Sequence, residues 1–137
     1  AARLANVYGP GVSAATVAGT VIAQLKKGRE PKVHDLSPVR DFLFVDDAAE
    51  GMIRLAAAAR PGKCLVVNMG TGKGVSVARL VETARRVAGR RPRATKAAKG
   101  SSLVLDTRRL ARLTRWLPST ALRRGLSACL APYAKKS

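Results

Sequence analysis

The 137-residue sequence has few of the side chains from which most metal and nucleophilic sites are built. It holds one histidine, His34, and two cysteines without a Cys-x-x-Cys spacing, so we expect no metal centre. A Ser/His/Asp or Cys/His arrangement cannot be argued from a single histidine. No apolar run approaches the roughly 20 residues of a membrane span. These absences favour a soluble globular protein, and Cys64 and Cys129 are expected to be reduced and buried.

Acidic residues are also scarce. The chain has 26 Lys and Arg against 8 Asp and Glu, a net charge of +18. Residues 1–50 are balanced, whereas residues 51–137 contain only Glu82 and Asp106 as acids. A field of this sign attracts polyanions such as nucleic acid, anionic lipid or acidic protein. Only five aromatic side chains occur, which argues against sequence-specific recognition of single strands by base stacking.

The apolar pattern indicates alternating strands and helices. Strands are expected over 3–8, 32–34, 42–45, 65–69 and 103–105. Helices are expected over 13–27, from a cap at Asp46 or Asp47 to about 59, from Ser76 to 89, after Asp106, and from about 120 to 133. In the second helix, Met52, Ile53 and Ala56 are expected to face inward. The alternation predicts an α/β fold.

The glycine-rich segment 70–74 stands between a predicted strand and a predicted helix, as a phosphate-binding loop does. Its spacing fits neither G-x-x-x-x-G-K-[ST] nor G-x-G-x-x-G. A structural turn is therefore favoured, although Lys73 could still meet an anion there. The Asp46-Asp47 pair is better explained as a helix cap than as an acid/base pair.

Four segments, in order and with matching spacing, resemble the extended short-chain dehydrogenase/reductase family of nucleotide-sugar epimerases and dehydratases. Residues 3–10 (RLANVYGP) are similar to R-x-x-N-x-Y-G-P, and residues 40–47 (RDFLFVDD) to R-D-F-x-x-V-D-D. Residues 67–72 (VNMGTG) resemble F-N-x-G-T-G. Residues 103–126, with Asp106, Trp116, Pro118 and Gly125-Leu126, follow A-D-x-x-[RK]…G-W-x-P…L-x-x-G-L. The resemblance implies the C-terminal part of a Rossmann-type fold, without the N-terminal dinucleotide-binding core.

The resemblance also implies site residues. Asn6 would contact the sugar or diphosphate of a nucleotide sugar, and Arg40 would pair with the diphosphate, since a guanidinium offers two parallel donors to phosphate oxygens. Asp41 would orient the stem of Arg40; the alternative for Arg40 is a surface ion pair with Asp41 or Asp47. Main chain around Ala5 would lie beside the nicotinamide of NAD or NADP. No catalytic residue is implied within this sequence.

Departures from the family pattern limit what the chain does alone. The Tyr-x-x-x-Lys dyad and the glycine fingerprint would lie before Ala1, so the chain reads as a fragment that needs an upstream Rossmann portion. A second phosphate-binding arginine is missing, and Lys99 is a single charge in its place. The glycine expected before Trp116 is Arg115, which is unfavourable if that backbone is left-handed. Arg123 and Arg124 replace two acids of the family pattern.

Two functions remain open. The first is a single substrate-binding lobe over residues 1–137, best matched over 1–72 and strongly basic and helical over 73–137. In the full-length protein a homodimer and an intracellular location are expected. The second is an epimerase-like fold that contacts RNA or another polyanion through residues 79–124, as a structural protein. A composition rich in Arg and Ala could also produce the basic surface without any partner. Whether the chain takes part in catalysis is not decided by the sequence.

Overall fold

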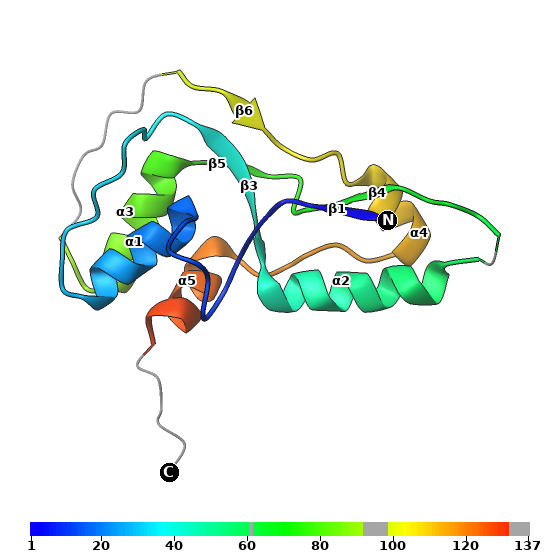
Figure 1. Cartoon of the computed structure of the whole chain (residues 1–137), viewed down its shortest axis with the longest axis horizontal. Helices are drawn as coiled ribbons and strands as arrows, with labels where there is room; N and C mark the ends of the chain where they lie inside the picture. The colour runs from blue at the N-terminus through cyan, green and yellow to red at the C-terminus, as the bar shows by residue number, and fades with distance from the viewer. Residues whose placement is uncertain (61, 92–98, 132–137) are drawn as a thin grey trace, which may run out of the picture.

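The computed structural model describes residues 1–60, 62–91 and 99–131. Strands and helices alternate along these residues, which confirms the predicted α/β class (Figure 1). The elements are β1 (Ala2–Leu4), β2 (Asn6–Tyr8), α1 (Val17–Lys26), β3 (Val39–Phe44), α2 (Val45–Ala58), β4 (Val67–Met69), β5 (Gly74–Ser76), α3 (Val77–Val87), β6 (Ser102–Leu103), α4 (Arg108–Thr114) and α5 (Leu122–Leu130).

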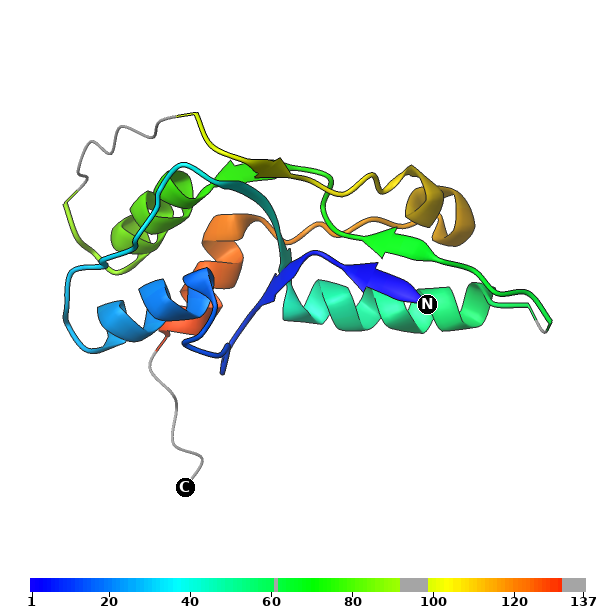
Figure 2. The ribbon, with the colours of Figure 1, turned by 45° about the horizontal axis from the view of Figure 1, so that its top comes forward.

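The predicted strand over 3–8 is two short strands that pair with different partners. β1 pairs with β4 and β2 pairs with β3, both in parallel. β3 also pairs with β5 in antiparallel fashion and with β6 in parallel. Figure 2 shows the chain bending after β1 and continuing as β2 toward β3, and Ala5 is the one residue between these two strands. One extended segment therefore connects two small sheets.

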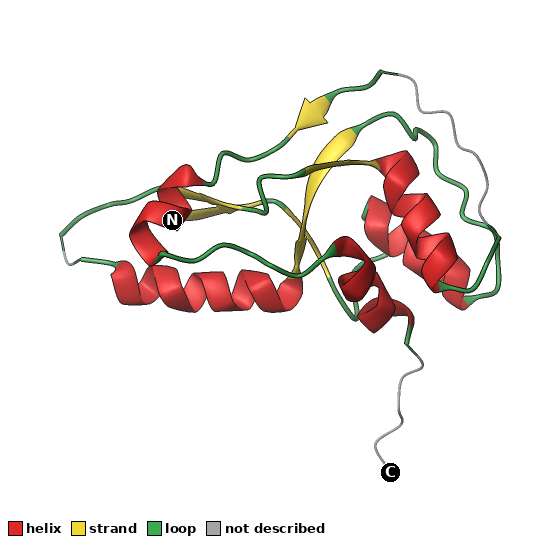
Figure 3. Cartoon of the chain, turned by 180° about the vertical axis from the view of Figure 1, so that it is seen from behind, coloured by secondary structure: helices red, strands yellow, loops and turns green. Residues whose placement is uncertain are grey.

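Alternation along β3 divides the interior into two cores, because successive side chains of a strand point to opposite faces. Phe42 and Phe44 pack against α1, α3 and α5, and Leu43 packs on the other face. Figure 3 shows these three helices gathered on one side, away from α2 and α4. We call the first group the helical core: Tyr8, Ala18, Val21, Ile22, Leu25, Phe42, Phe44, Val77, Leu80, Val81, Ala84, Leu126 and Cys129. The second group is the strand-side core: Leu43, Ala48, Val67, Met69 and Leu110.

Local signals define the ends of α1 and α3. The Thr16 hydroxyl accepts a hydrogen bond from the N–H of Gly19 at 3.1 Å, and the Ser76 hydroxyl accepts one from Arg79 at 3.1 Å. Such caps satisfy N–H groups that have no partner inside the helix. Gly28 and Gly89 follow the helix ends with positive φ angles of 71° each. The predicted stops at these glycines and the cap at Ser76 are confirmed.

The predicted cap and inner face of α2 are wrong. Phe44 occupies the N-cap position, and the Asp47 carboxylate instead accepts the N–H of Thr120 at 2.9 Å, on the segment that leads into α5. Met52 and Ile53 are 48% and 65% exposed, because Ala48 and Gly51 form the face that packs inward. The apolar stripe of α2 is thus left largely uncovered by the described residues.

Several predicted elements differ from the observed ones in their presence or bounds. Residues 32–34 form no strand, and the expected strand over 103–105 is only Ser102–Leu103. Thr107 rather than Asp106 is the N-cap of α4, although Asp106 accepts the N–H of Arg108. The last helix spans Leu122–Leu130, and residue 133 lies outside the described residues. Cys129 is buried as expected, but Cys64 is exposed.

Candidate functional site

The residues implied by the sequence gather where the two sheets diverge. Ala5 lies between β1 and β2, and its N–H donates to the carbonyl of Met69 at 2.9 Å, which continues the β1–β4 ladder by one bond. Beyond Ala5 the chain joins β3 instead. In open α/β sheets, ligands bind at the carboxyl ends of parallel strands, at the point where neighbouring connections separate. Ala5 occupies such a point.

Asp41 anchors the glycine-rich segment at this junction. Its side chain is 1% exposed. It accepts the N–H of Thr71 at 3.0 Å, the hydroxyl of Thr71 at 2.6 Å and the N–H of Gly72 at 2.9 Å. A Cβ on Gly70 would collide with the Asp41 carboxylate and lie 3.1 Å from the Cβ of Ala5. The loop amides are therefore occupied by a carboxylate of the same chain, which agrees with a structural turn.

Arg40 and Asp41 lie on opposite faces of β3, so the expected support of the Arg40 stem by Asp41 is wrong. Arg40 donates from Nη1 to the carbonyls of Val39 at 2.8 Å and Ser101 at 3.0 Å, and from Nη2 to the Ser101 hydroxyl at 3.1 Å. The alternative of an ion pair with Asp41 or Asp47 is also wrong for the described residues. A guanidinium has five N–H donors, and these hydrogen bonds use three of them. Two remain for an anion.

Asn6 shares one face of the β2–β3 pair with Arg40. It pairs in register with Phe42, two residues beyond Arg40, which is about 6.6 Å along the strand. Asn6 is exposed, and the part of the chain described shows no hydrogen bond to its side chain. The amide of Asn6 and the remaining donors of Arg40 are thus available from neighbouring strands.

Lys99 is exposed and precedes the segment that holds Arg40. A Cβ on Gly100 would collide with Ser37, so this position lets the chain pass close to the loop before β3. Ser101 then binds the Arg40 guanidinium. Sequence reasoning missed Ser101, and the only local signal was its place in the shortened segment 99–101. Arg40 thus contacts the segment that carries Lys99, through Ser101. Among the described residues, no direct contact joins Lys99 to Asn6.

Tyr8 is packed in the helical core and not exposed to a ligand site. Its hydroxyl donates to the carbonyl of Leu122 at 3.5 Å, and its ring packs edge-on against Phe44 with centroids 5.6 Å apart. Burial, with smaller contributions from Cys129 and Asp47, raises the pKa of Tyr8 well above its ordinary value. A tyrosine held in this way stays protonated and does not serve as an acid or base near neutral pH.

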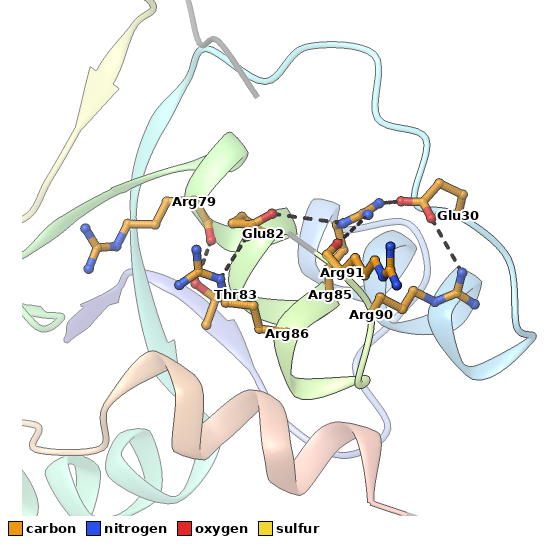
Figure 4. Close-up of polar contacts among 8 residues, drawn as sticks. All are labelled: Glu30, Arg79, Glu82, Thr83, Arg85, Arg86, Arg90 and Arg91. Atoms are coloured by element: carbon orange, nitrogen blue, oxygen red, sulfur yellow. Dashed lines mark hydrogen bonds and ion pairs between the residues drawn. The ribbon is translucent and has the colours of Figure 1, made fainter. Parts of the chain in front are cut away.

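The basic residues of segment 79–124, through which contact with a polyanion is expected, fall into separate groups among the described residues. Figure 4 shows the group around α3, where Arg85, Arg86 and Arg90 contact the acids Glu30 and Glu82. Arg85 is only 8% exposed and also donates to the carbonyl of Arg91 at 2.8 Å. α4, with its own arginines, lies at the opposite end of the molecule (Figure 1). Among the described residues, the basic side chains of α3 and α4 therefore do not form one continuous stripe.

Metal-binding clusters and membrane-spanning helices are both absent from the described residues. Residues 1–60, 62–91 and 99–131 contain no group of three or more His, Cys, Asp or Glu side chains that could hold a metal ion. Within the same ranges, no helix is long and apolar enough to cross a membrane.

Comparison with known sequences identifies relatives over the first half of the chain. The family model described as the NAD dependent epimerase/dehydratase family matches residues 1–70. UDP-arabinose 4-epimerase 1 of Arabidopsis thaliana is 36% identical over 63 residues, which cover 46% of this chain and 15% of that relative. UDP-glucose 4-epimerase of Streptomyces lividans is 50% identical over 52 residues, which cover 37% of this chain and 16% of that relative.

Comparison with solved structures extends the similarity over nearly the whole chain. The structure of RMD from Pseudomonas aeruginosa complexed with NADPH matches with a TM-score of 0.79 at 27% identity, covering 94% of this chain and 46% of that chain. UDP-glucose 4-epimerase of Thermotoga maritima with UDP-glucose matches with a TM-score of 0.76 at 28% identity, covering 94% and 43%. The chain thus spans less than half the length of these proteins. Their fold confirms the predicted Rossmann-type α/β architecture.

Proposed function

The chain belongs to the NAD-dependent epimerase/dehydratase family, and on that basis we propose that it is the substrate-binding portion of a nucleotide-sugar epimerase or dehydratase. The observation that carries the proposal is the placement of Asn6 and Arg40 on one face of the β2–β3 pair, beside the junction at Ala5. Arg40 would pair with the diphosphate through its two remaining donors, and Asn6 would contact the sugar or the diphosphate. Lys99 would add a single positive charge nearby.

The residues present fit the edge of a dinucleotide site. The carboxyl ends of β1 and β4 meet at Ala5, and Gly70 allows the following loop to approach the same point. Main chain around Ala5 would lie beside the nicotinamide of NAD or NADP, which supplies hydride transfer when bound. The role of this chain would be to position the sugar ring through Asn6 and Arg40.

An upstream portion would complete the site and the strand-side core. β1 pairs only with β4 among the described strands, yet parallel sheets are normally covered on both faces and extend over several strands. Leu4, Met52 and Ile53 are about half exposed or more, at 49%, 48% and 65%. A groove of about 760 Å³ lies between the start of β1, α2 and α4. A preceding Rossmann portion would cover this apolar surface and bring a Tyr/Lys dyad, because neither Tyr8 nor Tyr133 has a lysine four residues later.

The location and assembly expected for such a protein follow the same proposal. A full-length enzyme of this kind would act inside the cell, where its nucleotide-sugar substrate and nicotinamide cofactor are found, and would form a homodimer. Sedimentation of a chain extended at its N-terminus would test the homodimer: a monomer at micromolar concentration would contradict it.

Binding of UDP-glucose to the chain, followed by NMR chemical shifts and calorimetry, tests the role of Arg40. The expected result is perturbation of the Asn6 and Arg40 signals and about tenfold weaker binding for Arg40→Gln, since one charged hydrogen-bonded contact contributes roughly 1.5–3 kcal/mol. Arg29→Gln is the matched control, because Arg29 is exposed and lies on the loop after α1. Equal affinity for the two variants, or shifts that avoid Asn6 and Arg40 altogether, would refute the proposal.

A further inference from the structure

A groove between β1, β4 and α4 brings arginines together from separate elements. Its volume is about 820 Å³. Arg3 reaches it from β1, and α4 contributes three further arginines, whereas Asp106 is the one acidic side chain in its lining. The complete lining is Arg3, Val66, Asn68, Asp106, Arg108, Arg109, Ala111 and Arg112. We call it the arginine groove.

The arginines of the groove are only partly neutralised. Arg108 forms an ion pair with Asp106 at 2.5 Å, and its side-chain and backbone hydrogen bonds lower the pKa of Asp106 to about 2. Arg109 donates from Nη1 to the carbonyl of Val66 at 3.0 Å. Within the described ranges, Arg3 and Arg112 make no hydrogen bond or ion pair through their side chains. Asp106 therefore stays ionised and holds Arg108, and its charge also acts on Arg112, so that four arginines share one carboxylate in the lining of the groove.

The opposite end of the molecule differs in this respect. Around α3, Glu30 and Glu82 accept ion pairs from Arg85, Arg86 and Arg90 (Figure 4). Because those arginines have carboxylate partners, an added anion would have to compete with them. In the arginine groove an added anion would compete with only one carboxylate, that of Asp106.

We propose that the arginine groove binds the phosphate backbone of a nucleic acid without regard to base sequence. Guanidinium groups match phosphate oxygens with two parallel donors. Arg108 and Arg112 are one helical turn apart, a rise of about 6 Å along the axis of α4. The lining contains no aromatic ring on which a base could stack, so base recognition is not expected. Neither Asn6 nor Arg40 lines the groove, and the proposal is independent of nucleotide-sugar binding.

Fluorescence anisotropy of a labelled mixed-sequence 20-nucleotide RNA, titrated with the full chain at about 0.1 M salt, tests this inference. The groove variant is Arg3→Gln/Arg108→Gln/Arg112→Gln. The matched control is Arg79→Gln/Arg123→Gln/Arg124→Gln, which removes the same charge from exposed positions outside the groove. The groove variant is expected to bind at least about tenfold more weakly, with a salt dependence shallower by roughly 2 to 3 in the slope of log K against log salt. The control is expected to stay within about threefold of the unmodified chain.

Equal losses for the two variants would assign binding to diffuse charge and overturn the inference, as would no binding by the unmodified chain. Competition by poly-glutamate as strong as by unlabelled RNA would show that phosphate is not recognised. Displacement of the RNA by UDP-glucose would place both ligands in one site and would also contradict the proposal. Circular dichroism of each variant checks that both triple substitutions leave the fold intact.

Discussion

The helical core and the strand-side core meet at β3, but this chain encloses them to different extents. Three helices surround the first, and Phe42, Phe44 and Tyr8 fill its centre. The second has five buried residues, and Met52 and Ile53 of the adjacent α2 point outward. The exposed apolar surface near Leu4, Met52 and Ile53 therefore lies on the side of the molecule that carries β1. Under the proposed function an upstream portion would cover that surface, whereas residues of three helices already line the helical core.

The balance of acidic and basic side chains also differs between the helical side and the strand side. On the helical side, Glu30 pairs with the buried Arg85 and Glu82 pairs with the exposed Arg86. On the strand side, one aspartate faces four arginines in the arginine groove. Asp41 connects the two sides, because it sits in β3 and binds the loop that follows β4. The following changes test how far the two cores are independent, in order of decreasing effect.

A methyl group added to a helix glycine in each core gives the sharpest comparison. In Gly125→Ala the new Cβ would meet the Tyr8 ring and lie 2.8 Å from Phe44, both held in the helical core. We expect the free energy of unfolding to fall by roughly 3 kcal/mol, because rigid rings cannot yield. In Gly51→Ala the new Cβ would lie 2.9 Å from the Sδ of Met69 and from the partly exposed Trp116 ring, and we expect a smaller loss of about 1 kcal/mol because the flexible Met69 side chain can move aside.

Urea unfolding measured by circular dichroism gives both values. Equal destabilisation by the two substitutions would mean that the strand-side core is as closely packed as the helical core, contrary to the comparison above.

Removing the charge of Asp41 weakens the connection between the two sides. In Asp41→Asn the side-chain amide turns a donor toward Thr71 or Gly72, so one of three accepted hydrogen bonds is lost and a buried donor is left unpaired. The expected loss is about 2 kcal/mol of unfolding free energy, with faster amide exchange at Gly72. Asp35→Asn, at an exposed carboxylate whose hydrogen bonds come from the neighbouring Ser37, is the control and should change stability by less than about 0.5 kcal/mol. Unchanged exchange at Gly72 would contradict the anchoring role.

Arg115 lies on the strand side in a left-handed backbone, with φ of 51° and ψ of 30°. The resemblance of the sequence to the family pattern predicts glycine at this position, and the left-handed backbone gives the physical reason. Arg115→Gly should stabilise the chain by about 0.5–1 kcal/mol, because a side chain is unfavourable in this conformation. Arg112→Gly, inside α4, should have the opposite sign by about 1 kcal/mol. Thermal unfolding distinguishes the two, and a loss of stability in Arg115→Gly would show that its side chain contributes more than the strain.

The reactivity of Cys64 and Cys129 compares the two sides of the molecule without any substitution. Cys129 is 1% exposed in the helical core, and burial raises its pKa, so little thiolate is present at pH 8. Cys64 is exposed on the segment before β4. Iodoacetamide should modify Cys64 quickly and Cys129 only after addition of urea, as followed by mass spectrometry. Similar rates in the absence of urea would mean that the helical core opens readily.

Sequence patterns predicted the elements whose signals are local. Ser76 and Gly89 bracket α3, and its buried residues follow the expected spacing, because a cap and a helical repeat depend only on neighbours within one or two turns. Patterns failed for Met52 and Ile53, since the same apolar stripe fits a core or an interface. They failed also for Asp41, because its partners stand 30 residues away at Thr71 and 31 at Gly72.

The candidate site divides in the same way. The sequence alone determined which side chains to examine, Ala5, Asn6, Arg40 and Lys99, and the family to which the segment 1–70 belongs. Only the tertiary structure decided that Asn6 and Arg40 share a face, that Ser101 holds Arg40, and that Arg3 joins α4 in a groove. The physical reason is that residue identity specifies chemistry and local backbone preference, whereas the meeting of β1, β3, β4 and α4 depends on pairings between residues far apart in the chain.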